Sequence, residues 1–507
     1  MRSFLVLTLV GTLGFLAGCG SSGTPAGITI SITLTPSSAS LNAGQSVNIT
    51  ASVANDSSGK GVSWSLTGVG KLSSQTTTGV TYTAPATVTS TSIATVVATS
   101  IASSSVTASL PITVLPAGAT ANVVPISVNG GPLTPTAIYT NAAFVSVQVC
   151  APSNGACQTI PDILVDTGSF GLRLLGSELN SQLAAALTPL NDGNGNTLYD
   201  CVQFVDNSFL WGAVAPANII VGGETATSTS IQLIANPSFS IPSGCMGTNE
   251  DTQSLLGANG ILGVGPEPFD CGLACDPSAG GTPPTVYYLC GSGGNCSTTF
   301  VSCGSICSDS TPNQQVTNPV FNFPVDNNGT ILTLPAVNDV AATVNGTMTF
   351  GIGTQSNNTL PSTATLFTLN SSDNFTTNFG GQSLTGSFID SGSNGLFFPQ
   401  INNLPNICAD NSSWYCPTAT TQFTATNVDP NTGSTSNTVS FSVDNFDNVT
   451  AANPNDAAFS NLAGPMPCVS STACSFDWGL PFFYNRSVFT AIDGTTTPNG
   501  NGPFWAY

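Results

Sequence analysis

The chain has 507 residues, of which 40% are apolar and only 6% are charged, where soluble proteins carry about 25% charged residues. It contains 25 Asp and Glu against 5 Lys and Arg, which gives a formal net charge of −20. Histidine is absent, which excludes a Ser-His-Asp triad, a Cys-His dyad and a His-ligated metal site. The shortage of cations argues against nucleic-acid binding, because clustered Lys and Arg must neutralise phosphates. Any general acid or base is therefore expected to be a carboxylate, with Tyr as a weaker option.

The beginning of the chain has the pattern of an export signal. An apolar run over Phe4–Ala17 is shorter than a membrane-spanning helix and typical of a signal peptide. It leads to Cys19 in a pattern that resembles a bacterial lipobox, so we predict a lipoprotein signal peptide over residues 1–18 and lipidation of Cys19. An ordinary signal peptide with a chance cysteine is the alternative. The resemblance implies a lipid-anchored protein of the bacterial cell envelope, with the outer membrane as the expected site and residues 19–27 as a flexible tether.

The cysteine content agrees with export. The chain has 15 cysteines, and without Cys19 an even number remains, as expected for disulfides formed in an oxidising compartment. Short spacings predict the local pairs Cys150–Cys157, Cys408–Cys416 and Cys468–Cys474, with Cys201–Cys245 as a further pair. The pairing of six others is left open by the sequence: Cys271, Cys275, Cys290, Cys296, Cys303 and Cys307. A zinc cluster is the alternative for these six, although their spacings match no CxxC…CxxC pattern.

Residues 28–116 alternate apolar and polar residues in short runs separated by Gly, Asn and Ser turns. This pattern predicts an antiparallel β-sandwich. The segment resembles bacterial Ig-like surface domains, with Trp64 as the expected core aromatic residue. It carries no catalytic motif, so a spacer is the simpler interpretation and an adhesin for a glycan or a protein partner is the other.

One long-range repeat dominates the rest of the chain. Residues 164–174 (LVDTGSFGLRL) match residues 388–398 (FIDSGSNGLFF), and the two Asp residues lie 224 positions apart. Each copy predicts a strand, a tight turn that carries the Asp, and a second strand. A second repeated element, an apolar run with Gly, occupies residues 259–265 and 476–483. Two extended copies of each element are a much stronger signal than one Asp-Thr-Gly-Ser turn.

This constellation resembles the pepsin-like aspartic peptidases over residues 120–507, and most of all an uncharacterised bacterial lipoprotein family that shares the pattern. The resemblance implies an all-β chain, in which an N-terminal Ig-like β-sandwich precedes a bilobal pepsin-like β domain. The first lobe is expected over residues 120–330, with a Cys-rich insertion near residues 266–316, and the second lobe over residues 331–507.

The same resemblance assigns the site residues. Asp166 and Asp390 would form the catalytic dyad, with one proton shared between two carboxylates held about 3 Å apart. The residues that support the dyad would be Thr167, Gly168, Ser169, Ser391, Gly392 and Ser393. No metal and no cofactor is required by this chemistry.

The flap departs from the family pattern, because Phe204 or Val205 stands where the family has Tyr, Tyr199 comes several residues early, and Arg173 replaces a usual Trp. Two functions therefore remain open. The first is a membrane-anchored aspartic endopeptidase whose partner is a polypeptide substrate. The second is an inactive pepsin-like surface lipoprotein that binds peptide or glycan. A purely structural envelope protein is a third possibility, and the Asp motifs could also be simple turns.

Overall fold

The computed structural model describes residues 30–35, 39–88, 92–115, 122–152, 155–235, 239–304, 313–401, 405–468 and 474–507. This part of the chain is all-β, as predicted, and its few helices are short. The helices are α1 (Ser181–Ala186), α2 (Gln253–Leu256), α3 (Phe446–Ala452), η1 (Gly176–Glu178), η2 (Gly272–Cys275), η3 (Pro277–Ala279), η5 (Pro319–Asn322) and η6 (Leu480–Phe483). None of the helices in the described ranges is long and apolar enough to cross a membrane. The predicted signal peptide, Cys19 and the tether lie outside the described residues.

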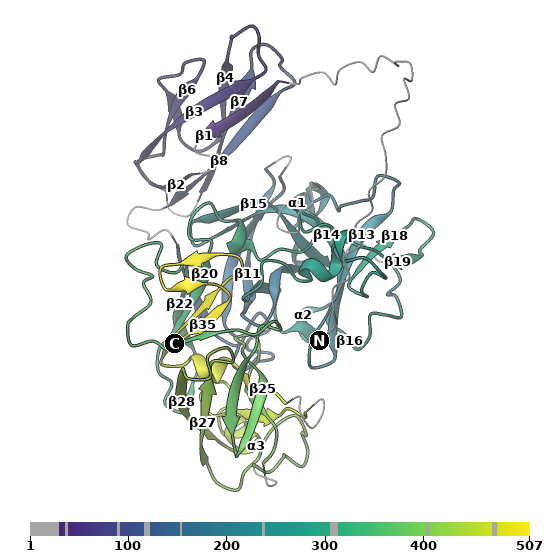
Figure 1. The fold of residues 1–507 in the computed structure, drawn as a ribbon, viewed down its shortest axis with the longest axis vertical. Coiled ribbons are helices and arrows are strands. Elements are labelled where there is room, and N and C mark those ends of the chain that lie inside the picture. The colour runs from purple at the N-terminus through teal and green to yellow at the C-terminus, as the bar shows by residue number, and fades with distance from the viewer. Residues whose placement is uncertain are drawn as a thin grey trace, which may run out of the picture.

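Residues 30–115 form two four-stranded sheets that enclose one core, at one end of the molecule in Figure 1. One sheet has the order β1 (Ser31–Thr35), β3 (Ser46–Ala54), β6 (Gly79–Thr83), β5 (Lys71–Ser73); the other has β2 (Ala39–Asn42), β8 (Thr107–Leu115), β7 (Ser92–Ser100), β4 (Val62–Gly68). The aromatic residue at the centre of the core is Tyr82, which is fully buried. Trp64, the expected core aromatic, is only half-buried against it. An Ig-like classification of this segment stays a prediction.

A sixteen-stranded sheet occupies the middle of the described chain and continues across the predicted domain boundary. Its order is β19 (Cys296–Thr298), β18 (Tyr287–Cys290), β13 (Thr197–Gln203), β14 (Ser208–Val221), β15 (Glu224–Ile234), β12 (Phe170–Leu175), β17 (Gly260–Val264), β11 (Cys157–Asp166), β10 (Phe144–Cys150), β9 (Val123–Val128), β22 (Val344–Phe350), β20 (Gly329–Leu334), β32 (Arg486–Ala491), β35 (Phe504–Ala506) and β23 (Leu366–Thr368), with β16 (Thr248–Asn249) beside β14. An additional pairing of β14 with β10 closes part of this sheet on itself.

A seven-stranded sheet lies at the end of the molecule opposite to β1–β8 (Figure 1). Its order is β28 (Ser436–Val443), β27 (Thr421–Val428), β24 (Phe375–Phe379), β25 (Gln382–Ile389), β31 (Asp477–Trp478), β26 (Leu396–Phe398) and β30 (Ala463–Pro465). Two small pairs complete the described strands: β21 (Val340–Ala341) with β29 (Ala458–Phe459), and β33 (Thr496–Thr497) with β34 (Gly500–Asn501). We call the strands β10–β19 the first lobe and the seven-stranded sheet the second lobe.

The sequence repeat corresponds to a repeated arrangement of strands. In the first lobe, β11 runs parallel to β17, β17 runs antiparallel to β12, and β12 runs parallel to β15. In the second lobe, β25, β31, β26 and β30 have the same three relations in the same order. Gly263 lies in β17 and Gly479 directly follows β31, and an added Cβ would lie 2.5 Å from Phe170 N and 2.0 Å from Gly395 O, respectively. Only glycine permits backbones to approach this closely.

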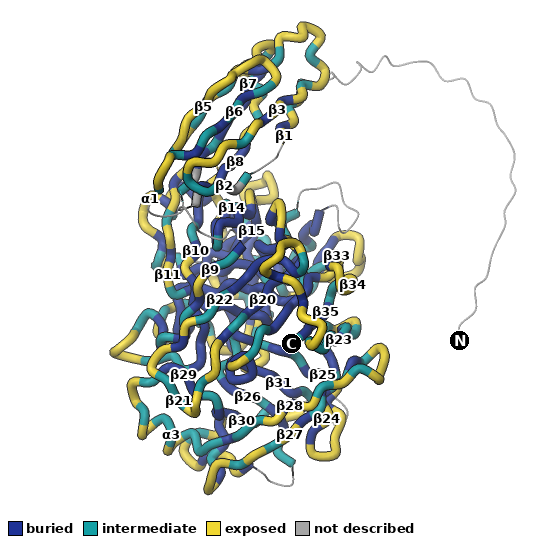
Figure 2. The backbone as a smooth tube through the Cα atoms, turned by 90° about the vertical axis from the view of Figure 1, so that its left-hand side faces the viewer, coloured by how far each residue is buried: buried dark blue, intermediate teal, exposed yellow. Residues whose placement is uncertain are grey.

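The buried residues run through both lobes without a break. Figure 2 shows the dark blue of buried backbone along β10 of the first lobe and along β9, β20 and β22, which belong to neither lobe. One apolar cluster includes Val165 of the first lobe, Met348 between the lobes and Trp478 of the second lobe. A continuous core of this kind fixes the two Asp turns relative to each other, because close-packed interiors transmit small displacements.

Candidate active site

The Asp166 turn follows β11 directly and is held by its own backbone. Gly168 N donates to Asp166 Oδ1 at 2.8 Å, and Ser169 Oγ donates to Asp166 Oδ2. Asp166 is only 6% exposed. The two predicted supporting residues of this turn therefore lie in hydrogen-bond contact with the carboxylate, which fixes its orientation.

The Asp390 turn in the second lobe repeats this arrangement. Gly392 N donates to Asp390 Oδ1 at 2.7 Å, and Ser393 Oγ donates to Asp390 Oδ2 at 2.9 Å. Asp390 N is bonded to the carbonyl of Trp478 on β31 at 3.1 Å, so the turn is attached to the strand beneath it. Each carboxylate thus receives one backbone and one hydroxyl donor.

Thr167 and Ser391 connect the two turns across the lobe interface. Thr167 Oγ1 accepts from Ser391 N at 2.9 Å and donates to Ile389 O at 3.1 Å. Ser391 Oγ accepts from Thr167 N at 3.1 Å and donates to Val165 O at 2.7 Å. Both side chains are fully buried. These four bonds are related by the internal two-fold repeat, and they hold the turns in contact.

The two carboxylates face each other's turns. A Cβ added to Gly168 would lie 2.6 Å from Asp390 Cγ, and one added to Gly392 would lie 2.6 Å from Asp166 Oδ1. The side chains of Asp166 and Asp390 therefore lie beside each other, close enough to interact electrostatically. Burial first, and then the charge of Asp390, raise the pKa of Asp166 well above its ordinary value. Two carboxyl groups this close cannot both ionise, so the pair retains one proton.

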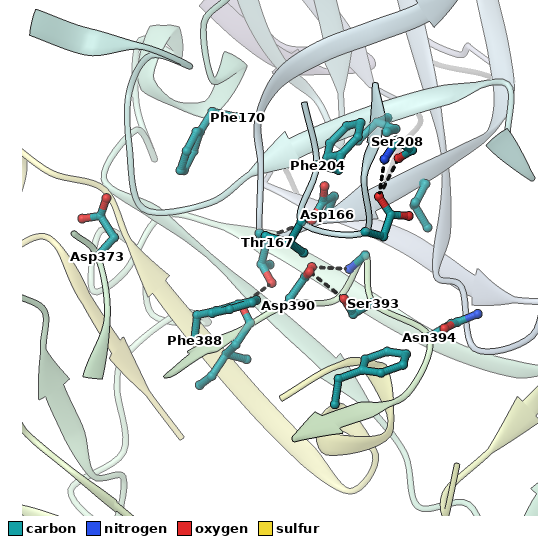
Figure 3. Close-up of a pocket in the computed structure, with 18 of the residues that line it drawn as sticks. Asp166, Thr167, Phe170, Phe204, Ser208, Asp373, Phe388, Asp390, Ser393 and Asn394 are labelled. Carbon is teal, nitrogen blue, oxygen red and sulfur yellow. Dashed lines mark hydrogen bonds between the residues drawn. The ribbon is translucent and has the colours of Figure 1, made fainter. Parts of the chain in front are cut away.

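The pair opens into a cleft of about 480 Å³ between the lobes. Figure 3 shows Asp166, Thr167, Asp390 and Ser393 gathered at its centre, with Asp373 and Asn394 toward the sides. The lining combines apolar and acidic residues from both lobes. Six lining residues were not predicted as site residues from the sequence, namely Tyr139, Ser208, Glu250, Asp373, Phe388 and Phe397.

The hairpin formed by β13 and β14 is the predicted flap. Its tip contributes Phe204 and Val205 to the cleft lining, and the Val205 side chain is 77% exposed. Tyr199 lies on β13, fully buried, and stacks on Trp211 with ring centroids 4.9 Å apart. The tyrosine of the cleft comes instead from Tyr139, outside the flap.

Arg173 is fully buried at the base of the flap. It forms ion pairs with Asp200 on β13 and, at 3.0 Å, with Asp270 of the Cys-rich segment, and it donates to Gln232 Oε1 on β15 at 2.9 Å. Burial raises the pKa of Asp200 to about 7. Arg173 therefore attaches the flap strand β13 to β15 and to the Cys-rich segment. The pepsin-like peptidases usually have Trp at this position.

The Cys-rich segment is part of the flap's sheet. Its strand β18 pairs with β13, and β19 pairs with β18. All four disulfides predicted from spacing are present, and two pairs that the sequence left open are also resolved: Cys150–Cys157, Cys201–Cys245, Cys408–Cys416, Cys468–Cys474, Cys271–Cys275 and Cys290–Cys296. Cys303 is disulfide-bonded as well. These cysteines cannot also serve as zinc ligands.

One buried group near the dyad was missed by the sequence analysis. Asp477 on β31 is 2% exposed, and its burial, with the charges of Asp390 and Asp166, raises its pKa well above the ordinary value. It belongs to the second repeated element, in the register position that Ile261 holds in the first. The signal was available in the alignment of the two copies, since an acidic residue replaces an apolar one in an otherwise apolar run.

Comparisons with known proteins concern mainly the part of the chain that contains this site. A family model described as "Protein of unknown function (DUF3443)" matches residues 118–507. The crystal structure of an aspartic proteinase from Irpex lacteus is 16% identical, covers 76% of this chain and 97% of that chain, and gives a TM-score of 0.44. A DUF4784 family protein from Bacteroides caccae is 11% identical, covers 42% of this chain and 58% of that chain, and gives a TM-score of 0.12. None of the curated proteins matches the chain.

Proposed function

We propose that this chain, which belongs to the DUF3443 family of proteins of unknown function, is an aspartic-type endopeptidase that hydrolyses extended polypeptide. The observation that carries the proposal is the cross-bracing of two Asp turns by Thr167 and Ser391, which holds the carboxyl groups of Asp166 and Asp390 side by side. A cleft of about 480 Å³ opens over the pair and offers room for a peptide segment.

The chemistry follows from one proton on two carboxyl groups. Asp166, whose pKa is raised by burial and by Asp390, holds the proton and donates a hydrogen bond to the carbonyl oxygen of the substrate. Asp390 takes a proton from a water molecule, which attacks the carbonyl carbon. The tetrahedral intermediate then releases the amine, which leaves with a proton from the pair. This mechanism uses only groups that this histidine-free chain possesses.

The proposed setting is the bacterial cell envelope. Lipidation at Cys19 would attach the protein to the outer membrane, and the tether and N-terminal sheets would separate the cleft from the lipid surface. The polypeptide substrate would then be an envelope or external protein in an extended state.

Cleavage of denatured casein tests the proposal, from about pH 2.5 to about pH 6, with and without pepstatin. The mature protein is expected to generate fragments. Asp166→Asn and Asp390→Asn, each nearly isosteric, are expected to generate none, with unchanged circular dichroism. Absence of cleavage by the wild type above these two variants at every pH would reject the proposal.

The second candidate function is a non-catalytic surface lipoprotein that binds peptide or glycan in the same cleft. The flap favours this alternative, because its tip carries Phe204 and Val205 where the resemblance leads us to expect Tyr. Tyr199 is buried away from the cleft and does not replace that residue. Binding that survives in the Asp166→Asn/Asp390→Asn double variant, together with no cleavage by the wild type, would support this alternative. Binding that is lost with the two carboxylates would count against it.

A further inference from the structure

A second cavity lies outside the cleft of the paired aspartates and shares none of its lining residues in the described chain. Its volume is about 510 Å³, which suits a small-molecule ligand. Residues of β28, β32 and the segment 361–364, together with Tyr507, line it. Among these described residues Arg486 is the only charged side chain, and no Asp or Glu is present. The first cleft is rich in carboxylates, whereas the second presents a single cation.

The lack of an acidic partner sets Arg486 apart. The chain has 25 Asp and Glu against 5 Lys and Arg, and its last 390 positions, which match the family model, contain two arginines. Arg173 is fully buried and forms ion pairs with Asp200 and Asp270. Arg486 is half-buried and forms no ion pair with any residue in the described ranges. Because buried charges are normally paired, we expect the partner of Arg486 to come from a ligand.

The guanidinium of Arg486 is held in place with one edge unused. Its Nη1 donates to Phe482 O at 2.6 Å and to Tyr484 O at 3.3 Å, and its Cζ lies 4.5 Å from the centroid of the Phe482 ring. Nε and Nη2 make no hydrogen bond with any residue that the structure describes. Through the edge formed by these two nitrogens, an arginine binds a carboxylate with two parallel hydrogen bonds. The side chain is therefore preorganised for an anion.

The rest of the lining indicates the kind of anion. Six lining side chains carry a hydroxyl or an amide: Thr363, Asn437, Thr438, Ser440, Asn485 and Ser487. Such groups both donate and accept hydrogen bonds, as the hydroxyls of a sugar do. One guanidinium balances the single charge of a carboxylate, whereas a phosphate monoester carries about −1.5 to −2. The net charge of −20 on the chain opposes such a dianion more strongly than a carboxylate. Peptide C-termini are typically captured by backbone N–H groups, and the donor here is a side chain.

We propose that this cavity binds a saccharide unit that carries a carboxylate, such as a uronic acid. The carboxylate accepts hydrogen bonds from Nε and Nη2 of Arg486, and the sugar hydroxyls bond to the polar side chains around it. The cavity is separate from the cleft of Asp166 and Asp390, so the inference goes beyond the proposed hydrolysis and does not depend on it. An acidic glycan could be held here while the cleft stays open to polypeptide.

Ligand-observed NMR on the full chain tests the proposal with D-glucuronate and its neutral counterpart D-glucose. Glucuronate is expected to bind about tenfold to a hundredfold more tightly, because its carboxylate adds charge-assisted hydrogen bonds. No detectable binding of glucuronate at about 50 mM, or equal binding of the two sugars, would overturn the proposal. Inorganic phosphate or N-acetylglycine, the latter a probe for a peptide C-terminus, would overturn the assignment of a saccharide by binding as tightly as glucuronate.

Variants test whether glucuronate binds in this cavity. Arg486→Gln is expected to weaken glucuronate about tenfold or more and to leave glucose unchanged. Because Arg486 also supports two carbonyl groups, Ser440→Trp is the second variant: it fills the cavity from an exposed position of β28 and leaves those bonds intact. It is expected to abolish glucuronate binding, whereas Thr385→Trp, at an exposed position of β25 outside the cavity, retains it.

Binding that survives in Ser440→Trp, or that is lost equally in Thr385→Trp, would overturn the placement of the site. The Asp166→Asn variant separates this inference from the peptidase proposal. It is expected to bind glucuronate as the wild type does, so a wild type that cleaves nothing but binds glucuronate would reject the peptidase alone. A wild type that cleaves casein but does not bind glucuronate would reject the saccharide site alone.

Discussion

The two lobes hold their aspartates in the same way but support them differently. Asp166 and Asp390 each receive one backbone N–H and one serine hydroxyl, and the bracing bonds between the turns are reciprocal. The strands beneath the turns differ, because β17 presents Ile261 and β31 presents Asp477. The difference teaches that the repeat preserves the geometry of the pair, while the strands beneath the two turns can differ by an ionisable side chain.

Among the variants that keep both carboxyl groups, the largest effect is expected from filling the space between the turns. Gly168→Ala and Gly392→Ala would each place a methyl group 2.6 Å from the opposite carboxylate. We expect each variant to lose about 10²- to 10⁴-fold in kcat/KM, since the pair could no longer share a proton. Gly293→Ala, where nothing lies within 4 Å of the added Cβ, is the matched control. If either variant kept more than about a tenth of the wild-type kcat/KM, the two turns would not contribute equally to the close approach of the carboxyl groups.

The bracing residues test the symmetry of the lobes through stability. Ser391→Ala and Thr167→Val each leave one buried N–H and one buried carbonyl without their partner. We expect each to lower the free energy of unfolding by about 2–4 kcal/mol, with similar values for the two. Thr424→Val, at an exposed position of β27, is expected to change it by less than about 0.5 kcal/mol. Denaturant titration measures all three, and a clearly unequal cost would show that one lobe holds the interface.

A buried carboxyl group outside the dyad makes the pH dependence of stability a further test. Burial, followed by the charge of Asp326, raises the pKa of Glu224 from 4.5 to about 8. The folded state therefore holds a proton that the unfolded chain releases. This contribution to stability is fully present below about pH 4.5 and is lost as the pH rises toward about 8. We expect the unfolding free energy to fall across this window, and to fall less in Glu224→Gln than in Asp447→Asn, an exposed control. A wild type that becomes more stable as the pH rises through this window would contradict this.

The smallest effect concerns the flap, which belongs to the first lobe. The Cys201–Cys245 disulfide ties β13 to the segment before β16. In the Cys201→Ala/Cys245→Ala double variant, we expect KM to rise about threefold to tenfold with kcat nearly unchanged, because the flap contacts substrate rather than the reacting atoms. The Cys468→Ala/Cys474→Ala double variant removes a pair in the second lobe and is expected to leave KM unchanged. A fall in kcat with no change in KM would contradict the assignment of the β13–β14 hairpin as a flap that contacts substrate.

The sequence was sufficient for the features that repeat. Asp166 and Asp390, their supporting residues and the local disulfides could be predicted because each is encoded by a short motif or a short spacing. Arg173 could not be assigned a role in the same way, since its partners Asp200 and Asp270 come from segments distant in the sequence. Trp64, expected as the core aromatic residue, packs only half-buried against the N-terminal core, and Tyr82 is the fully buried aromatic residue there, because alternation along a strand does not determine how deeply a side chain is buried.

The pH profile of kcat/KM for a single peptide tests the central claim most directly, namely that one carboxyl group from each lobe shares a single proton. The account predicts a bell-shaped profile on the acid side of neutrality, whose two apparent pKa values belong to the pair. It also predicts that Asp166→Asn and Asp390→Asn are at least about 10³-fold slower throughout. A rate that is flat or still rises at neutral pH, or either variant cleaving as fast as the wild type, would contradict it.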